Sequence, residues 1–135
     1  MNAPEAEVRA LLARYFDGLY TGDVELLEQV FHPAALYATA DERPLLHRSM
    51  PEYFRVVASR QSPASRNEVR RDRIERIQFA GDNTALARVR CSIGRRDFVD
   101  FLSLVRVDGH WRVMAKVFQI IERNEEGDEA CHTST

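Results

Sequence analysis

Residues 97–121 read DFVDFLSLVRVDGHWRVMAKVFQII, two apolar segments joined by Asp108-Gly109. Glycine accepts the positive φ that a tight turn demands, and Asp-Gly between alternating segments is a strong hairpin signal. The sequence therefore predicts a long antiparallel hairpin with its turn at Asp108-Gly109. Both faces of this hairpin are mostly apolar, so we expect one face to meet helices and the other to meet a second sheet or a second subunit.

The length of the turn decides which polar side chains of the hairpin share a face. If the turn contributes two residues, Ser103 and Lys116 lie on one face and Asp100 lies on the other. If the turn contributes three residues, the register slips by one, and Asp100 lands beside Phe118 and diagonally across from Lys116. The first register makes Asp100 an interface or solvent residue, which is the interpretation we prefer. The second makes Asp100 and Lys116 a proton-transfer pair.

The rest of the sequence predicts helices first and strands afterwards. Apolar residues recur at helical spacing in 4–20, 24–30 and 50–60, and alternation marks strands in 69–79 and 84–93. Shorter strands are predicted at 34–40 and 43–47, and Ser49 with Glu52 forms a capping-box pattern before the third helix. This order predicts an α+β fold with three helices on the concave face of a curved, mostly antiparallel sheet. Because three helices cannot seal such a sheet, we expect a pocket.

The composition is that of an ordinary globular domain. The chain has 135 residues, 44% hydrophobic and 30% charged, with a formal net charge of -2. We expect residues 1–121 to form one domain and 122–135 a flexible acidic tail. The charge gives no general attraction to nucleic acid or to anionic lipid, and no segment is apolar and long enough to span a membrane. Cys91 in a predicted strand and Cys131 in the tail do not suggest a disulfide, so we expect a cytoplasmic protein.

Several short strings carry a family resemblance. They are LARY at 12–15, GD at 22–23, FHPAA at 31–35, GDNTA at 81–85 and DGHWRV at 108–113. Together they resemble the nuclear transport factor 2-like superfamily, which includes ketosteroid isomerases, polyketide cyclases of the SnoaL type and the group named "putative lumazine-binding". DFL at 100–102 and KVF at 116–118 are most similar to that last group. The resemblance implies a cone-shaped α+β fold, on which many unrelated functions occur.

The ketosteroid isomerases provide a test of activity within this resemblance. Those enzymes use a carboxylate base, together with a tyrosine and a protonated aspartic acid that stabilise an enolate oxygen. By a gap-free comparison Tyr15 matches the tyrosine, the base position falls at Thr39, and the acid position falls at Ser103. Neither of the last two is a carboxyl group, so we do not expect steroid isomerisation. The same comparison implies that the face with Ser103, Lys116 and Phe118 looks into the pocket.

The candidate residues support two classes of function. A metal-free isomerase, dehydratase or cyclase would act on a small, partly apolar carbonyl compound and use acid–base groups, for which the candidates are Tyr15, Lys116, Asp100, Ser103 and His47. A non-catalytic module would bind a ligand or form a homodimer through the outer face of the sheet. The residues expected to line the pocket are Tyr37, Thr39, Tyr53, Phe54, Arg88, Phe101, Met114 and Phe118. The aromatic members of this list equally fit a plain core, and Lys116 is either buried or snorkelling past the sheet edge.

Other features of the sequence predict neither a cofactor nor a nucleic-acid partner. No pair of metal-binding residue types has ligand spacing on a common predicted element, and there is no glycine-rich phosphate loop. Nine arginines between 66 and 96 form a basic stretch, but Glu68, Asp72 and Glu75 interrupt it. We interpret most of them as the exposed side of an outer strand. Arg88 and Arg90 are exceptions that could hold a ligand carboxylate if they face the concave side.

Overall fold

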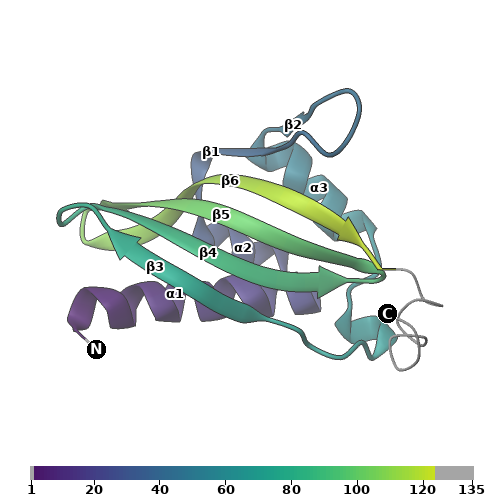
Figure 1. Ribbon diagram of the computed structural model, residues 1–135, viewed down its shortest axis with the longest axis horizontal. Helices are drawn as coiled ribbons and strands as arrows, with labels where there is room; N and C mark the ends of the chain where they lie inside the picture. Colours follow the sequence, from purple (N-terminus) through teal and green to yellow (C-terminus); the bar gives the residue numbers. More distant parts are fainter. Residues whose placement is uncertain (1, 124–135) are drawn as a thin grey trace.

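The computed structural model describes residues 2–123 as three helices packed on one face of a curved, six-stranded sheet (Figure 1). The helices are α1 (Ala3–Thr21), α2 (Val24–Val30) and α3 (Met50–Ser59), and a short 3-10 turn, η1, spans Ala64–Arg66. The strands are β1 (Phe31–Thr39), β2 (Leu46–Arg48), β3 (Arg73–Phe79), β4 (Thr84–Ile93), β5 (Arg96–Val107) and β6 (His110–Glu122). The predicted α+β class is confirmed.

Local signals set the ends of the helices. Gly22 ends α1 in the left-handed conformation, with φ of 70°, which glycine adopts without a steric penalty. The Asp23 carboxylate then accepts a hydrogen bond from the Leu26 backbone N–H and begins α2. At α3, Ser49 and Glu52 form the predicted capping box. These caps fix a chain reversal between α1 and α2 and the direction in which α3 crosses the sheet.

The sheet runs in the order β2-β1-β6-β5-β4-β3. Within residues 2–123, β1 and β6 are parallel, and each other neighbouring pair is antiparallel. Strand β1 begins at Phe31, three residues before the predicted start at 34, because His32 and Pro33 are already extended when α2 ends. The predicted tail at 122–135 lies outside the described residues except for Glu122, which is the last residue of β6, and Arg123.

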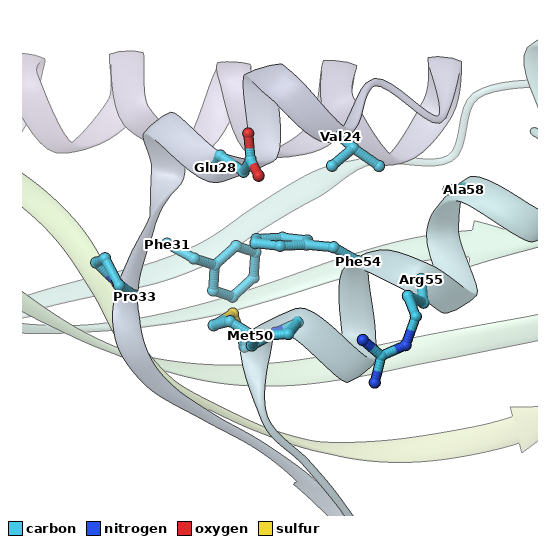
Figure 2. A pocket seen from close by; sticks show the side chains of 9 residues that line it. Val24, Glu28, Phe31, Pro33, Met50, Phe54, Arg55 and Ala58 are labelled. Carbon is cyan, nitrogen blue, oxygen red and sulfur yellow. The ribbon is translucent and has the colours of Figure 1, made fainter.

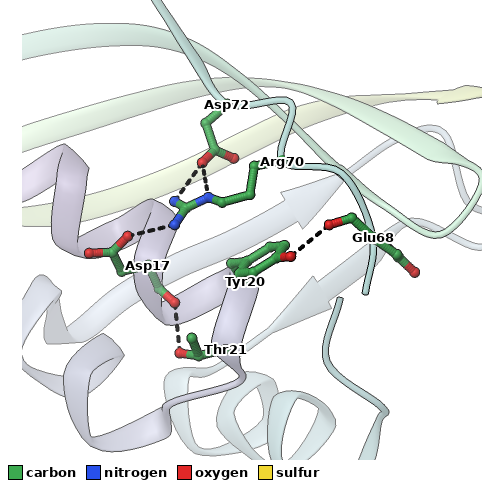
Figure 3. Close-up of polar contacts among 6 residues, drawn as sticks. All are labelled: Asp17, Tyr20, Thr21, Glu68, Arg70 and Asp72. Carbon is green, nitrogen blue, oxygen red and sulfur yellow. Dashed lines mark hydrogen bonds and ion pairs between the residues drawn. The ribbon is translucent and has the colours of Figure 1, made fainter. Parts of the chain in front are cut away.

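The segment 67–72 is fastened to α1 instead of extending β3 (Figure 3). The Arg70 guanidinium donates to Asp17 Oδ1 at 2.9 Å and to Asp72 Oδ2 at 2.6 and 2.8 Å. The same group lies 4.8 Å from the ring centroid of Tyr20, whose hydroxyl donates to the Glu68 carbonyl at 2.6 Å. These contacts pull the backbone away from β4, so the strand predicted over 69–79 begins at Arg73.

The hairpin has the two-residue turn but also a β-bulge that the sequence did not indicate. Asp108 and Gly109 both have positive φ, as a tight two-residue turn requires. Leu104 pairs with Val113 and Ser103 pairs with Ala115, so Met114 is an extra residue in β6. Beyond this bulge the register is shifted by one, and Asp100 pairs with Phe118. Our preferred assignment of Asp100 to the outer face is therefore wrong, and the cause is the bulge and not a longer turn.

Candidate functional site

Three polar side chains meet inside the core, and they come from α1, β5 and β6. The Tyr15 hydroxyl donates a hydrogen bond of 2.5 Å to Asp100 Oδ2. The Lys116 ammonium lies 3.9 Å from the same oxygen. Tyr15 and Asp100 are 0% exposed and Lys116 is 4% exposed, so this is an ion pair buried inside the protein. We call these three residues the polar cluster.

Aromatic rings surround the ammonium group of the polar cluster. Lys116 Nζ lies 5.2 to 5.6 Å from four ring centroids, those of Tyr15, Tyr37, Tyr53 and Phe118. At such distances the negative faces of the rings attract a cation, and the attraction is larger when water is excluded. Tyr37 is stacked on Tyr53 with centroids 4.4 Å apart, and its ring is also 4.9 Å from that of Phe118. The rings thus fill the space where the sequence predicted an open hollow.

Burial and charge set the protonation states in the polar cluster. Burial by itself lowers the pKa of Lys116, but the Asp100 carboxylate outweighs burial and raises that pKa above its ordinary value. Burial, reinforced by the Asp100 charge, raises the pKa of Tyr15, and burial also raises the pKa of Tyr53. Near neutral pH the lysine is therefore an ammonium and both phenols keep their protons. The cluster contains proton donors around one carboxylate acceptor.

Two polar atoms beside the ammonium group have no hydrogen-bond partner among residues 2–123. They are the Tyr53 hydroxyl and Asp100 Oδ1, both of which are buried. A buried polar group without a partner costs about 1–3 kcal/mol of stability, so native proteins contain few of them. The sequence suggested Tyr53 only as a lining residue, and its unsatisfied hydroxyl depends on packing that no local pattern encodes.

A pocket of about 560 Å³ lies between α2, α3 and the start of β1 (Figure 2). Its apolar lining includes Phe31, Met50 and Phe54, and it is completed by Val24, Glu28, Pro33, Pro51, Arg55 and Ala58. Figure 2 shows the rings of Phe31 and Phe54 side by side, with Glu28 on the α2 side and Arg55 on the α3 side. We call this the helix pocket. Of its lining residues the sequence analysis named Phe54 alone.

One aromatic ring separates the helix pocket from the polar cluster. Phe31 lines the pocket, and its ring centroid is 5.9 Å from that of Tyr15 and 5.6 Å from that of Tyr53. Phe54, which is half-buried, lies 5.7 Å from Tyr53 on the same helix. The apolar stripe of α3 and the Phe31 side chain at the α2–β1 junction were the signals that could have located the pocket.

Three residues predicted to face the pocket lie on the outer face of the sheet. Ser103 and Phe101 are exposed, because β5 turns the alternate residues Asp100, Leu102 and Leu104 towards the helices. Arg88 pairs with Phe101 across the sheet and is exposed as well. Its guanidinium donates to Glu75 Oε1 at 2.7 Å and does not reach towards a concave pocket. The assignments of Ser103, Phe101 and Arg88 to the pocket are therefore wrong.

The remaining predicted residues divide between the core and the surface. Thr39 is buried, and its hydroxyl donates to the Phe118 carbonyl at 2.7 Å, which leaves it a structural role in joining β1 to β6. Met114 is the half-buried bulge residue. His47 is exposed on the short strand β2, opposite Ala38, and lies outside the linings of the helix pocket and the polar cluster.

Two searches of the described residues bear on metals and membranes. Within 2–123, no group of three or more His, Cys, Asp or Glu side chains is arranged to hold a metal ion. Cys131 and His132 lie outside the described residues. None of the helices in this part of the chain has the length and hydropathy needed to cross a bilayer.

Comparison with known proteins identifies the fold and the family. Three helices against a mixed six-stranded sheet define a nuclear transport factor 2-like protein, as in two structures of unknown function. These are from Silicibacter pomeroyi (24% identity, 90% of this chain and 100% of that one, TM-score 0.75) and Shewanella baltica (23%, 87% and 93%, 0.76). A ketosteroid isomerase-like protein from Erwinia carotovora is also similar (12%, 90% and 99%, 0.71). Residues 3–119 match the family described as "Putative lumazine-binding", and the chain belongs to that family. No curated protein matches the chain.

The first prediction concerns the buried ion pair. Asp100→Asn nearly keeps the shape of the side chain but removes the charge that faces Lys116. We expect it to lower the free energy of unfolding by about 3–5 kcal/mol, because it leaves a buried ammonium without a counter-charge. The double variant D100N/K116M should lose less than the sum of the single variants. Urea unfolding followed by circular dichroism measures all four proteins, and additive losses would contradict the pairing.

The second prediction concerns Glu75 on the outer face. Hydrogen bonds from Arg73, Arg88 and Arg90 lower the pKa of Glu75 to about 2, from an ordinary value of 4.5. Because the folded pKa is the lower one, this stabilisation is complete above the ordinary pKa and is lost as pH falls towards 2. Glu75→Gln should therefore flatten the decline of the unfolding midpoint in acid. Glu25→Gln, an exposed position in α2, serves as the control, and equal acid slopes for E75Q and the native protein would refute the assignment.

Proposed function

We propose that this protein binds a small, flat, partly apolar molecule in the helix pocket. The observation that carries the proposal is the pocket itself, about 560 Å³ with an apolar floor of Phe31, Met50 and Phe54. Pockets of this size enclose small organic ligands, and aromatic linings stack against planar rings. Glu28 and Arg55 add one charge of each sign at its sides, where polar substituents of a ligand would lie.

The family description supports a planar heterocycle as the ligand. Lumazine, the compound in that description, is a flat bicyclic ring with polar edges. Its size and shape suit a pocket with two phenylalanine rings at the floor. Planar ligands lose little conformational entropy on binding, so a modest contact area is enough for measurable affinity.

Acid–base catalysis by the polar cluster is a second candidate function. The Tyr15 hydroxyl at 2.5 Å and the Lys116 ammonium at 3.9 Å both face Asp100 in a water-excluded core. Such a group of donors and one acceptor could move a proton beside a carbonyl, as a metal-free isomerase, dehydratase or cyclase requires. Steroid isomerisation is not proposed, because Thr39 occupies the base position and its hydroxyl is held by Phe118. A substrate would have to pass Phe31 and Phe54 to reach Asp100.

We also propose a cytoplasmic protein with one domain over 1–121. Cys91 is a free, buried thiol on β4, and burial raises its pKa above the ordinary value, which makes it unreactive. A reducing compartment suits a chain that keeps such a thiol. Fractionation of cells that express the tagged chain would locate it.

The third prediction tests the helix pocket with lumazine. We expect the native protein to bind lumazine with a dissociation constant in the range of about 1 μM to 1 mM. Ala58→Trp should weaken binding at least about tenfold, because the indole fills the pocket from the exposed side of α3. Ala13→Trp, at an exposed position of α1, is the matched control. Isothermal titration calorimetry measures the three proteins, and equal affinity for A58W and A13W would place the ligand elsewhere.

The fourth prediction concerns a homodimer through the outer face of the sheet. Leu36, Leu86, Phe101 and Val117 come from four neighbouring strands and are 39 to 51% exposed. Contiguous apolar side chains of this kind are typical of an interface, and a second copy would cover them symmetrically. We expect a dimer at micromolar concentration in sedimentation velocity and a monomer for Phe101→Glu. Val69→Glu, exposed outside the sheet, is the control, and a native monomer would rule the dimer out.

A further inference from the structure

The two unpartnered atoms of the core have complementary hydrogen-bonding character. The Tyr53 hydroxyl is a donor without an acceptor, and Asp100 Oδ1 is an acceptor without a donor, among residues 2–123. We propose that these two atoms recognise the amide edge of a planar ligand, with its N–H on Asp100 and its C=O on Tyr53. This inference rests on the proposed ligand-binding function and specifies the ligand as a neutral lactam.

The hydrogen bonds already present in the polar cluster leave this pair of atoms available. Tyr15 and Lys116 both address Asp100 Oδ2, so Oδ1 of the same carboxylate is the oxygen that can accept from a ligand. A phenol donates one hydrogen, and Tyr53 has no acceptor for it within the described core. A cis amide presents a donor and an acceptor side by side, which is the complement of this arrangement.

The charge balance of the polar cluster favours a neutral ligand. Asp100 and Lys116 offset each other, so no net charge is left for a ligand ion to compensate. A ligand carboxylate would face Asp100, and a ligand cation would face Lys116, in a core where water cannot screen the repulsion. An amide carries a large dipole without a net charge. Its carbonyl oxygen would lie on the side of the ammonium group and its N–H on the side of the carboxylate.

The helix pocket gives this ligand a place for the rest of its ring system. Phe31 forms the floor of the pocket and contacts Tyr53 on its other side. Phe54 is half-buried and borders both regions, so its ring is the one that must turn towards solvent for the pocket to join the polar cluster. The ligand ring then takes the position of the Phe54 ring. Tyr37 and Tyr53 are already stacked, with an interplanar angle of 25°, and offer a flat surface beside it.

The test uses two planar compounds that differ in one hydrogen-bond donor. 2-Quinolone is a neutral bicyclic lactam, and 1-methyl-2-quinolone lacks its N–H. Isothermal titration calorimetry on the native protein should show binding of 2-quinolone about tenfold tighter than binding of the methylated compound, the loss expected for one buried hydrogen bond. Equal affinities would overturn the amide-edge inference while leaving the helix pocket as a binding site. Absence of binding by both compounds would overturn both.

Tyr53→Phe tests the carbonyl contact and separates a ligand role from a structural one. If the hydroxyl serves the ligand, Y53F should weaken 2-quinolone about tenfold and also raise the urea midpoint of the free protein, because a buried hydroxyl without a partner is removed. Tyr37→Phe, which removes a hydroxyl from the neighbouring stacked ring, should leave the affinity unchanged. A lower midpoint for Y53F would show that the hydroxyl stabilises the core itself, and unchanged affinity would show that it does not touch the ligand. Either result would overturn the proposal.

Discussion

An ion pair inside an apolar core sets the conditions for the rest of this structure. Removing an ammonium and a carboxylate from water costs several kcal/mol for each ion, and only close, well-directed contacts offset that cost. The Tyr15 hydrogen bond to Asp100 and the four rings around Lys116 provide such contacts. They require α1, α3, β1, β5 and β6 to be in place together. The polar cluster thus favours one arrangement of helices and sheet over others that would bury a similar apolar area.

The same arrangement explains why the ligand-binding capacity lies at the edge of the core. Aromatic side chains that solvate the ammonium also occupy the concave side of the sheet, where nothing larger than a side chain is accommodated. The remaining space lies beyond Phe31, between α2 and α3, and is apolar. The protein therefore has an apolar outer chamber and a polar inner one. A ligand that used both would need a hydrophobic ring and a small polar edge.

The sequence predicted the elements well and the chemistry of the interior less well. Alternation and the Asp108-Gly109 turn placed β5 and β6, and Ser49 with Glu52 placed the start of α3, because these signals are local. Nothing in the residues around Met114 marks a bulge, and that one residue moved Lys116 to the face of Asp100. Lys116 in an apolar strand signalled burial but could not identify its partner, because Asp100 and Tyr15 come from distant parts of the chain. Phe31 and Met50 were overlooked for the same reason.

The position of β6 in the sheet has a consequence for how the chain matures on the ribosome. This strand, the last of the described residues, lies between β1 and β5 and forms the parallel pair that attaches β1 and β2 to the sheet. Until it has been synthesised, the first strand has no hydrogen-bonding neighbour but β2, and the inner face of α1 has only part of its covering. Contacts between such distant segments form late and slowly. The nascent chain therefore has to remain without its final packing until almost all of its length has left the exit tunnel, a period in which chaperone binding has most to protect.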